Sequence, residues 1–204
     1  MRFQRPLIAI ALLLTTATSV FAVSAEQKRE RLRLLRTGEF RLMNLSLLDR
    51  AYLDVRTLLG QQNACSNFFG GSKSEKALEE LLVELREERF GDPRIGVRMS
   101  GFFTLFGDSE KSPSYRLFEI AALNTQGPFY KAKVFAADQY VPAVGSFGPN
   151  TREVRVLILL HELAHLVQGK DHAWFIPDDG NSPQLSRLNT STVEARCGRQ
   201  IRAL

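Results

Sequence analysis

The stretch "VLILLHELAHLVQG", residues 156–169, begins with twelve residues that are apolar apart from His161, Glu162 and His165. Such a run belongs in a protein interior, where a polar group without a partner costs about 2 to 7 kcal/mol. A metal ion or a set of hydrogen bonds must therefore compensate the three polar side chains. Which of the two applies decides whether the stretch has a chemical function.

Local signals on both sides of this stretch predict a helix. Asn150 can cap its start, with Pro149 before it and Glu153 three residues later, as in a capping box. Gly169 is a natural C-terminal stop. We therefore expect a helix over residues 151–168.

On that helix His161 and His165 lie one turn apart on one face, and Glu162 follows His161 by about 100°. Their imidazoles can therefore bind one ion. In zinc hydrolases, neutral imidazoles hold Zn²⁺ at about 2.0 to 2.1 Å, an open position carries water, and a neighbouring carboxylate removes a proton from it. The spacing predicts His161 and His165 as metal ligands and Glu162 as the general base.

The letters "HELAH" form the HExxH motif, and residues 74–200 resemble the zincin metallopeptidases in their order of amphipathic helix, short strands, motif helix and further helix. The resemblance implies a minimal zincin fold, Zn²⁺, a peptide or protein substrate and a third ligand farther along the chain. "LNTQGPFY" (residues 123–130) and "DGNSPQLSRLNTSTVEARC" (residues 179–197) are also similar to segments of small exported bacterial proteins with an HELxH helix. That second resemblance implies no substrate.

The third ligand is open in the sequence. The metzincin pattern HExxHxxGxxH would place glycine at 168 and histidine at 171, but the chain has Gln168 and Asp171, with Gly169 and His172 one residue later. One extra helical residue turns the chain by about 100°, so His172 departs from the family's position. Asp171 lies where the pattern has its third histidine, but residue 168 is glutamine and not the glycine of the pattern. Both residues are candidates.

Two other zincin patterns supply further candidates. In the gluzincin pattern a glutamate on a following helix completes the site, and Glu194 lies in a helix expected over residues 182–201. In the aspzincin pattern a downstream loop aspartate binds the metal, and "IPDDGN" offers Asp178 and Asp179, although such letters also form ordinary turns. We favour Asp179 as the third ligand, with His172, Asp171 and Glu194 as alternatives.

These residues predict a zinc-dependent hydrolase, specifically a metallopeptidase that uses Glu162 as general base. One alternative is a zinc hydrolase that cleaves a non-peptide amide, such as cell-wall material. The other is a non-catalytic, disulfide-stapled exported binding module with a structural metal or none, in which His161 and His165 are hydrogen-bonded core residues and Glu162 is their partner.

Residues 1–25 have the order of a secretory signal peptide. Arg2 and Arg5 precede an apolar run, and small residues follow, ending in Ala22 or Ala25. We expect cleavage, a secreted or periplasmic protein, and no stable membrane insertion afterwards. An uncleaved membrane anchor is the alternative.

Composition argues against a nucleic-acid partner. The chain of 204 residues has 27 basic and 22 acidic residues. Loss of the two signal-peptide arginines leaves 25 basic residues and a net charge of +3. The remaining basic residues are scattered, and Lys28–Arg36 has the pattern of the solvated face of an amphipathic helix. No nucleic-acid-binding motif accompanies them.

Cys65 and Cys197 are the only cysteines. In an exported chain such a pair predicts a disulfide, because the compartment is oxidising and the spacing fits no metal or redox motif. Two buried free thiols are the alternative.

The length suits one domain, residues 26–204, of the α+β class and mainly helical. We expect residues 26–73 to form a helical N-terminal part, and the resemblance implies that residues 74–204 form a zincin-like core with the metal site. Apolar spacing predicts helices over 27–36, 40–60 and 74–90. Alternation predicts a small antiparallel sheet of three strands, at 95–106, 115–124 and 129–137.

Overall fold

The computed structural model describes residues 23–39, 44–105, 115–134, 139–169, 173–180 and 182–204. These residues form helices and a small sheet, in agreement with the predicted fold class in its broad form. In chain order the elements are α1 (Ala25–Thr37), α2 (Leu47–Gly60), α3 (Ala64–Phe69), the short 3₁₀ turn η1 (Gly71–Ser74), α4 (Glu75–Glu84), β1 (Arg86–Glu88), β2 (Val97–Leu105), β3 (Tyr115–Asn124), β4 (Lys133–Val134), β5 (Gln139–Tyr140), α5 (Arg152–Leu166) and α6 (Pro183–Ile201).

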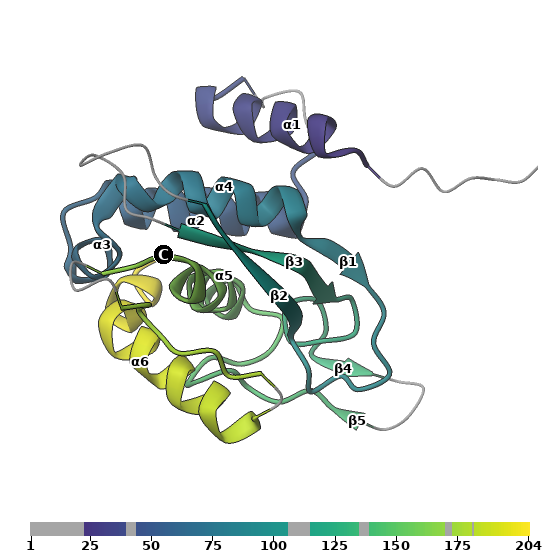
Figure 1. Cartoon of the computed structure of the whole chain (residues 1–204). Coiled ribbons are helices and arrows are strands. Elements are labelled where there is room, and N and C mark those ends of the chain that lie inside the picture. The colour runs from purple at the N-terminus through teal and green to yellow at the C-terminus, as the bar shows by residue number, and fades with distance from the viewer. Residues whose placement is uncertain (1–22, 40–43, 106–114, 135–138, 170–172, 181) are drawn as a thin grey trace, which may run out of the picture.

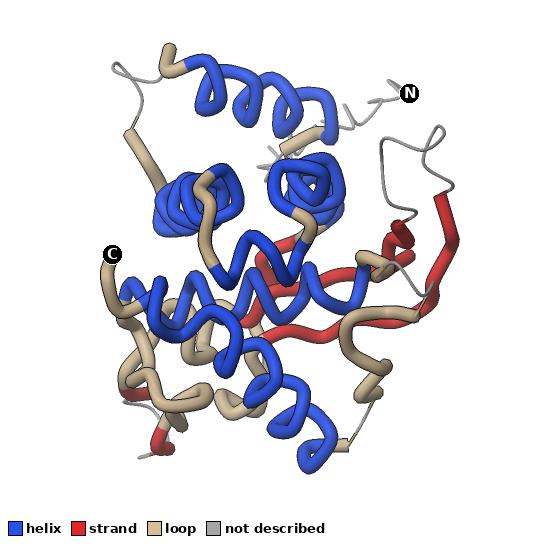
Figure 2. The backbone as a smooth tube through the Cα atoms, turned by 90° about the vertical axis from the view of Figure 1, so that its left-hand side faces the viewer, coloured by secondary structure: helices blue, strands red, loops and turns tan. Residues whose placement is uncertain are grey.

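The elements are stacked in layers, with α1 outermost on the neighbouring helices α2 and α4 (Figures 1 and 2). The three-stranded sheet and α5 lie on the other side of α2 and α4, and α6 lies beyond α5. The core fills the space between these layers, where Leu59, Leu78 and Leu160 are each at most 1% exposed. None of the helices in the described ranges is long and apolar enough to cross a membrane. The predicted signal peptide falls almost entirely in residues 1–22, outside the described residues.

The predicted helix over 27–36 is confirmed as α1, which buries Leu32 and Leu35. The helix predicted over 40–60 begins later, as α2. Ser46 caps it, because its side chain accepts a hydrogen bond from the Asp49 backbone N–H and Asp49 accepts one from Ser46 in return. Residues 40–43 lie outside the described part of the chain.

The helix predicted over 74–90 is wrong at its C-terminal end. α4 ends at Glu84, and the residues after it form β1, parallel to β3. Lys28 of α1 donates through Nζ to the carbonyls of Val83 and Leu85, both at 2.8 Å. It thereby satisfies terminal carbonyl groups that a longer helix would have bonded internally. A contact with a distant part of the chain thus accompanies the end of the helix.

The predicted antiparallel sheet is also wrong in part. β2 and β3 pair antiparallel as expected, but the strand order is β1-β3-β2 and the β1–β3 pair is parallel, so the sheet is mixed. Of the strand predicted over 129–137, residues 129–134 are described and do not join this sheet, whereas residues 135–137 lie outside the described part of the chain. Phe129 and Tyr130 lie in a turn in which Tyr130 donates its N–H to the Gly127 carbonyl at 3.1 Å. After this turn, β4 pairs with β5 in a separate two-stranded ribbon.

The motif helix α5 matches its prediction apart from its ends. Thr151 rather than Asn150 caps it, since Asn150 has a φ of 60°, in the left-handed region, and the Thr151 side chain accepts a backbone hydrogen bond from the first turn. The helix ends at Leu166, because Val167 leaves the helical conformation and forms a β-bridge with Tyr115.

The predicted disulfide is present. It joins Cys65 of α3 to Cys197 of α6, and both residues are fully buried. α6 begins after Ser182, whose side chain accepts a hydrogen bond from the Leu185 N–H, close to the predicted start. The bond therefore ties the last helix to the N-terminal helical part.

Candidate metal centre

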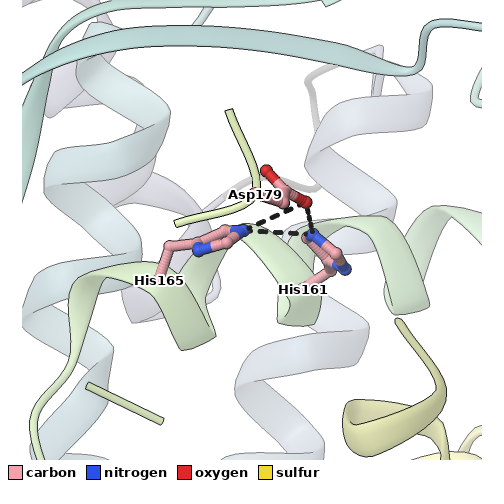
Figure 3. Close-up of side chains that lie close together, drawn as sticks. All are labelled: His161, His165 and Asp179. Carbon is pink, nitrogen blue, oxygen red and sulfur yellow. Dashed lines mark hydrogen bonds and ion pairs between the residues drawn. The ribbon is translucent and has the colours of Figure 1, made fainter. Parts of the chain in front are cut away.

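Three side chains that can bind a metal meet beside α5 (Figure 3). His161 and His165 project from successive turns of α5, and Asp179 comes from the loop between α5 and α6. The Nε2 atoms of the two histidines are 3.1 Å apart. Oδ2 of Asp179 lies 3.3 Å from Nε2 of His161 and 3.7 Å from Nε2 of His165. Within the described ranges this is the only such cluster of three.

The separations suit zinc. Ligand atoms about 2.0 to 2.2 Å from Zn²⁺ at tetrahedral angles lie about 3.3 to 3.6 Å from one another. The observed values, 3.1, 3.3 and 3.7 Å, are distributed around that range. Two imidazole nitrogens and one carboxylate oxygen are also a donor set of three-ligand catalytic zinc sites, which keep a fourth position open. The residues present therefore fit the ion.

Asp179 contributes a negative charge to this cluster. Partial burial raises its pKa, but the adjacent imidazoles of His161 and His165 outweigh that effect and hold the pKa well below its usual range. The carboxyl group is therefore ionised at neutral pH. An ionised carboxylate between two imidazoles is suited to a divalent cation, since metal ligands must be deprotonated.

A hydrogen bond from α6 orients one of the two histidines. Nδ1 of His161 lies 3.1 Å from Oγ1 of Thr190, and both residues are buried. When Nδ1–H donates to Thr190, the lone pair of Nε2 is free for a metal, as in sites where an outer partner fixes the histidine tautomer. Nδ1 of His165 is buried without a hydrogen-bond partner among the described residues. Thr190 therefore acts on His161 alone.

Glu162 is buried beside the cluster, with 8% exposure. Its carboxyl group makes no hydrogen bond or salt bridge to the part of the chain that the structure describes; the partners of the histidines are Asp179 and Thr190. Burial raises the pKa of Glu162 to about 7; the neighbouring His161 acts against this rise, and the Asp179 carboxylate adds to it. A carboxyl group of this kind can exchange a proton near neutral pH.

The loop that carries Asp179 is held in place. Ile176 is buried in the core at 1% exposure. Asn189 of α6 donates through Nδ2 to the Pro177 carbonyl at 2.8 Å, and the Ser182 N–H donates to the Asp179 carbonyl at 2.8 Å. The third candidate ligand is therefore presented by a loop with fixed ends.

Of the other predicted ligands, Glu194 and Asp178 are described, and neither joins the cluster. Glu194 accepts a hydrogen bond from the Ser146 backbone at 3.0 Å and forms an ion pair with Arg202, also at 3.0 Å. Asp178 forms an ion pair with Arg116. The remaining candidates, Asp171 and His172, lie outside the described residues.

Sequence reasoning missed two residues that support the centre, Thr190 and Arg116. Thr190 precedes Cys197 by seven residues, so the two share one face of α6, which indicates burial. Arg116 is a cation within the apolar stretch "YRLFEIAALN", the same kind of signal that singled out the histidines. Neither signal identifies a partner.

Comparisons with family models, with curated proteins and with solved structures found no match to this chain. A functional assignment therefore depends on the residues of this centre and their arrangement.

Proposed function

We propose that the protein is an exported zinc-dependent hydrolase, specifically a metallopeptidase of the zincin type. The supporting observation is that His161, His165 and Asp179 converge at separations suited to zinc. The buried Glu162, without a hydrogen bond among the described residues, lies next to them. A carboxyl group buried in this way costs folding free energy, and such a cost is characteristic of functional sites.

In this proposal the chain's own residues have distinct roles. His161, His165 and Asp179 hold the ion, and Thr190 keeps His161 in the metal-binding tautomer. Bound Zn²⁺ would supply Lewis-acid chemistry, polarising the scissile carbonyl and lowering the pKa of water. Glu162 accepts the proton of the attacking water and passes it to the leaving amine.

Export is part of the proposal. The disulfide between Cys65 and Cys197 is typical of proteins in oxidising compartments. Of the two predicted cleavage sites, the one after Ala22 would preserve the N-cap of α1, in which Ser24 accepts a hydrogen bond from the Gln27 N–H. Cleavage after Ala25 would remove that cap. We therefore propose the earlier site.

The test is the substitution Glu162→Gln in the purified mature protein. We expect one equivalent of zinc by elemental analysis, as in the wild type, and a loss of peptide hydrolysis of at least about 100-fold. His161→Ala and Asp179→Ala should lose the zinc. Glu153→Gln, on the first turn of the same helix, is the matched control and should keep both properties. Full activity of Glu162→Gln would overturn the mechanism.

One observation favours the non-catalytic binding module as a second candidate. Asp179 and Thr190 lie close enough to the histidines for hydrogen bonds and ion pairs to hold the cluster together without a metal ion. Purified wild-type protein without stoichiometric zinc would support that candidate. Zinc-containing protein that cleaves non-peptide amides but no peptide in a substrate panel would instead support the amide hydrolase.

A further inference from the structure

Arg116 is a buried cation near the start of β3. The residue is 6% exposed, and its Cζ lies 3.8 Å from the ring centroid of Phe102 and 4.2 Å from that of Trp174. Stacking on aromatic rings compensates only part of the cost of burying a guanidinium group. The remaining compensation comes from two segments of the chain, and each of them carries a candidate metal ligand.

The first segment is the C-terminal end of α5. Nε of Arg116 donates to the carbonyl of His165 at 2.8 Å. Carbonyls in the last turn of a helix have no partner within the helix, and the N–H of Gly169, four residues later, donates to Ala173 instead. A cation here also interacts favourably with the helix dipole. Arg116 thus caps α5 at the residue that supplies one candidate ligand.

The second segment is the loop between α5 and α6. Nη1 of Arg116 donates to Oδ2 of Asp178 at 3.3 Å, and Nη2 donates to the other carboxylate oxygen. Such a two-point pair fixes direction as well as distance. Asp178 directly precedes Asp179, so a fixed Asp178 side chain restricts the backbone that presents the third candidate ligand. The Asp178 side chain is 46% exposed, so this pair is a weak source of stability and its main effect is geometric.

We propose that Arg116 is a positioning residue that sets the distance between the helix ligand His165 and the loop ligand Asp179. This inference rests on the proposed function, because it concerns the same metal centre. A loop ligand that is ordered before the metal arrives loses less conformational entropy on binding, and metal affinity rises accordingly. Arg116 contributes to that order because its planar fork bonds to the His165 carbonyl and to the Asp178 carboxylate at once.

The test compares Zn²⁺ affinity, measured by competition with a chromophoric chelator, in Arg116→Lys, Asp178→Asn and wild-type protein. Lysine keeps the charge but cannot make the two-point pair and the carbonyl bond together. We expect both variants to bind Zn²⁺ about 10- to 100-fold more weakly. In metal-free protein, hydrogen exchange should become faster in residues 173–180. Asp178→Asn changes a half-exposed side chain and should therefore fold. It provides the result if Arg116→Lys does not fold.

Arg152→Lys is a closely matched control. At the other end of α5, Arg152 also pairs with a carboxylate through two bonds, to Asp54 at 2.6 and 2.8 Å, and with a backbone carbonyl, that of Leu204. Its replacement should leave zinc affinity within about twofold of the wild type, because it contacts no ligand segment.

The outcomes separate this inference from the proposed function. Wild-type zinc affinity in Asp178→Asn or in folded Arg116→Lys, or an equal loss in Arg152→Lys, would overturn the positioning role alone. Wild-type protein that binds zinc but hydrolyses no substrate would overturn the proposed function alone. Wild-type protein that binds no zinc would overturn both.

Discussion

Replacing Glu162 by glutamine should change how the stability of the metal-free protein depends on pH. Burial raises the pKa of the Glu162 carboxyl group from 4.5 to about 7. Between these values the folded protein keeps a proton that the unfolded chain has released, so its stability falls as the pH rises. Glutamine has no such proton. This part of the pH dependence should therefore disappear in the variant.

The size of the effect follows from the pKa of Glu162. Each pKa unit corresponds to about 1.4 kcal/mol, so complete ionisation of Glu162 lowers the free energy of unfolding by about 3 kcal/mol. About 2.5 kcal/mol of this falls between pH 5 and pH 8. Asp179 does not contribute in that window, because its pKa is held low and its contribution is lost only in acid.

Urea unfolding at pH 5, 6, 7 and 8 measures this effect, after zinc has been removed with a chelator and with the disulfide intact. The quantity of interest is the difference in unfolding free energy between the variant and the wild type at each pH. Titration of groups that lie far from Glu162 cancels in this difference. Glu153→Gln is the matched control, and its stability curve should run parallel to that of the wild type.

Parallel curves for Glu162→Gln and the wild type would refute the reasoning. They would show that the carboxyl group of Glu162 is as well solvated in the folded protein as in the unfolded chain. A wild type that gains stability toward pH 8 relative to the variant would show that Glu162 has a partner for its ionised form. Either result would remove the physical basis for proton exchange by Glu162 near neutral pH.

Two further substitutions test the residues that frame the centre. Replacing Cys65 and Cys197 together by alanine should lower the free energy of unfolding by about 5 kcal/mol, the chain-entropy value for a loop of 132 residues. Denaturant unfolding measures this, and a loss below about 1 kcal/mol would contradict it. Thr190→Val should weaken Zn²⁺ binding about 10- to 100-fold in a chelator competition, because His161 loses its hydrogen-bond partner. Thr192→Val, exposed on the same helix, should have wild-type affinity, and equal affinities in the two variants would argue against the role of Thr190.

Elements with strong local signals could be predicted from the sequence. α1, α5 and α6 each lie within two residues of their predicted ends, because apolar spacing and caps act over a few residues. The errors occur where distant contacts act. The end of α4 is stabilised by Lys28, 55 residues from Val83, and β1 exists only because β3 pairs with it. Helix propensity contains no information about such partners.

The candidate site shows the same division between local and distant information. His161, Glu162 and His165 could be predicted because they lie on one helix, where spacing alone fixes their relative directions. The third ligand could not be selected by spacing, because a loop separates Asp179 from the helix and several residues fit by count. In the structure Asp179 lies beside the two histidines because the ends of that loop are fixed, through the bond from Asn189 to the Pro177 carbonyl and the burial of Ile176.

The long-range contacts around the candidate ligands add to the evidence that the five-residue motif gives for a metal site. "HELAH" by itself specifies two ligands and a base, and three fixed letters also arise by chance in proteins that bind no metal. Buried polar side chains need hydrogen-bond partners with or without a metal, but partners that also fix the direction of the ligand atoms add to what the motif alone indicates. Here Thr190 bonds to His161 over 29 residues of sequence, while Arg116 bonds to His165 over 49 and to Asp178 over 62. Two separate elements, α6 and β3, thus converge on the ligand segments, and such convergence is expected where orientation of the ligands matters. This is why the long-range contacts, more than the motif, support a metal centre.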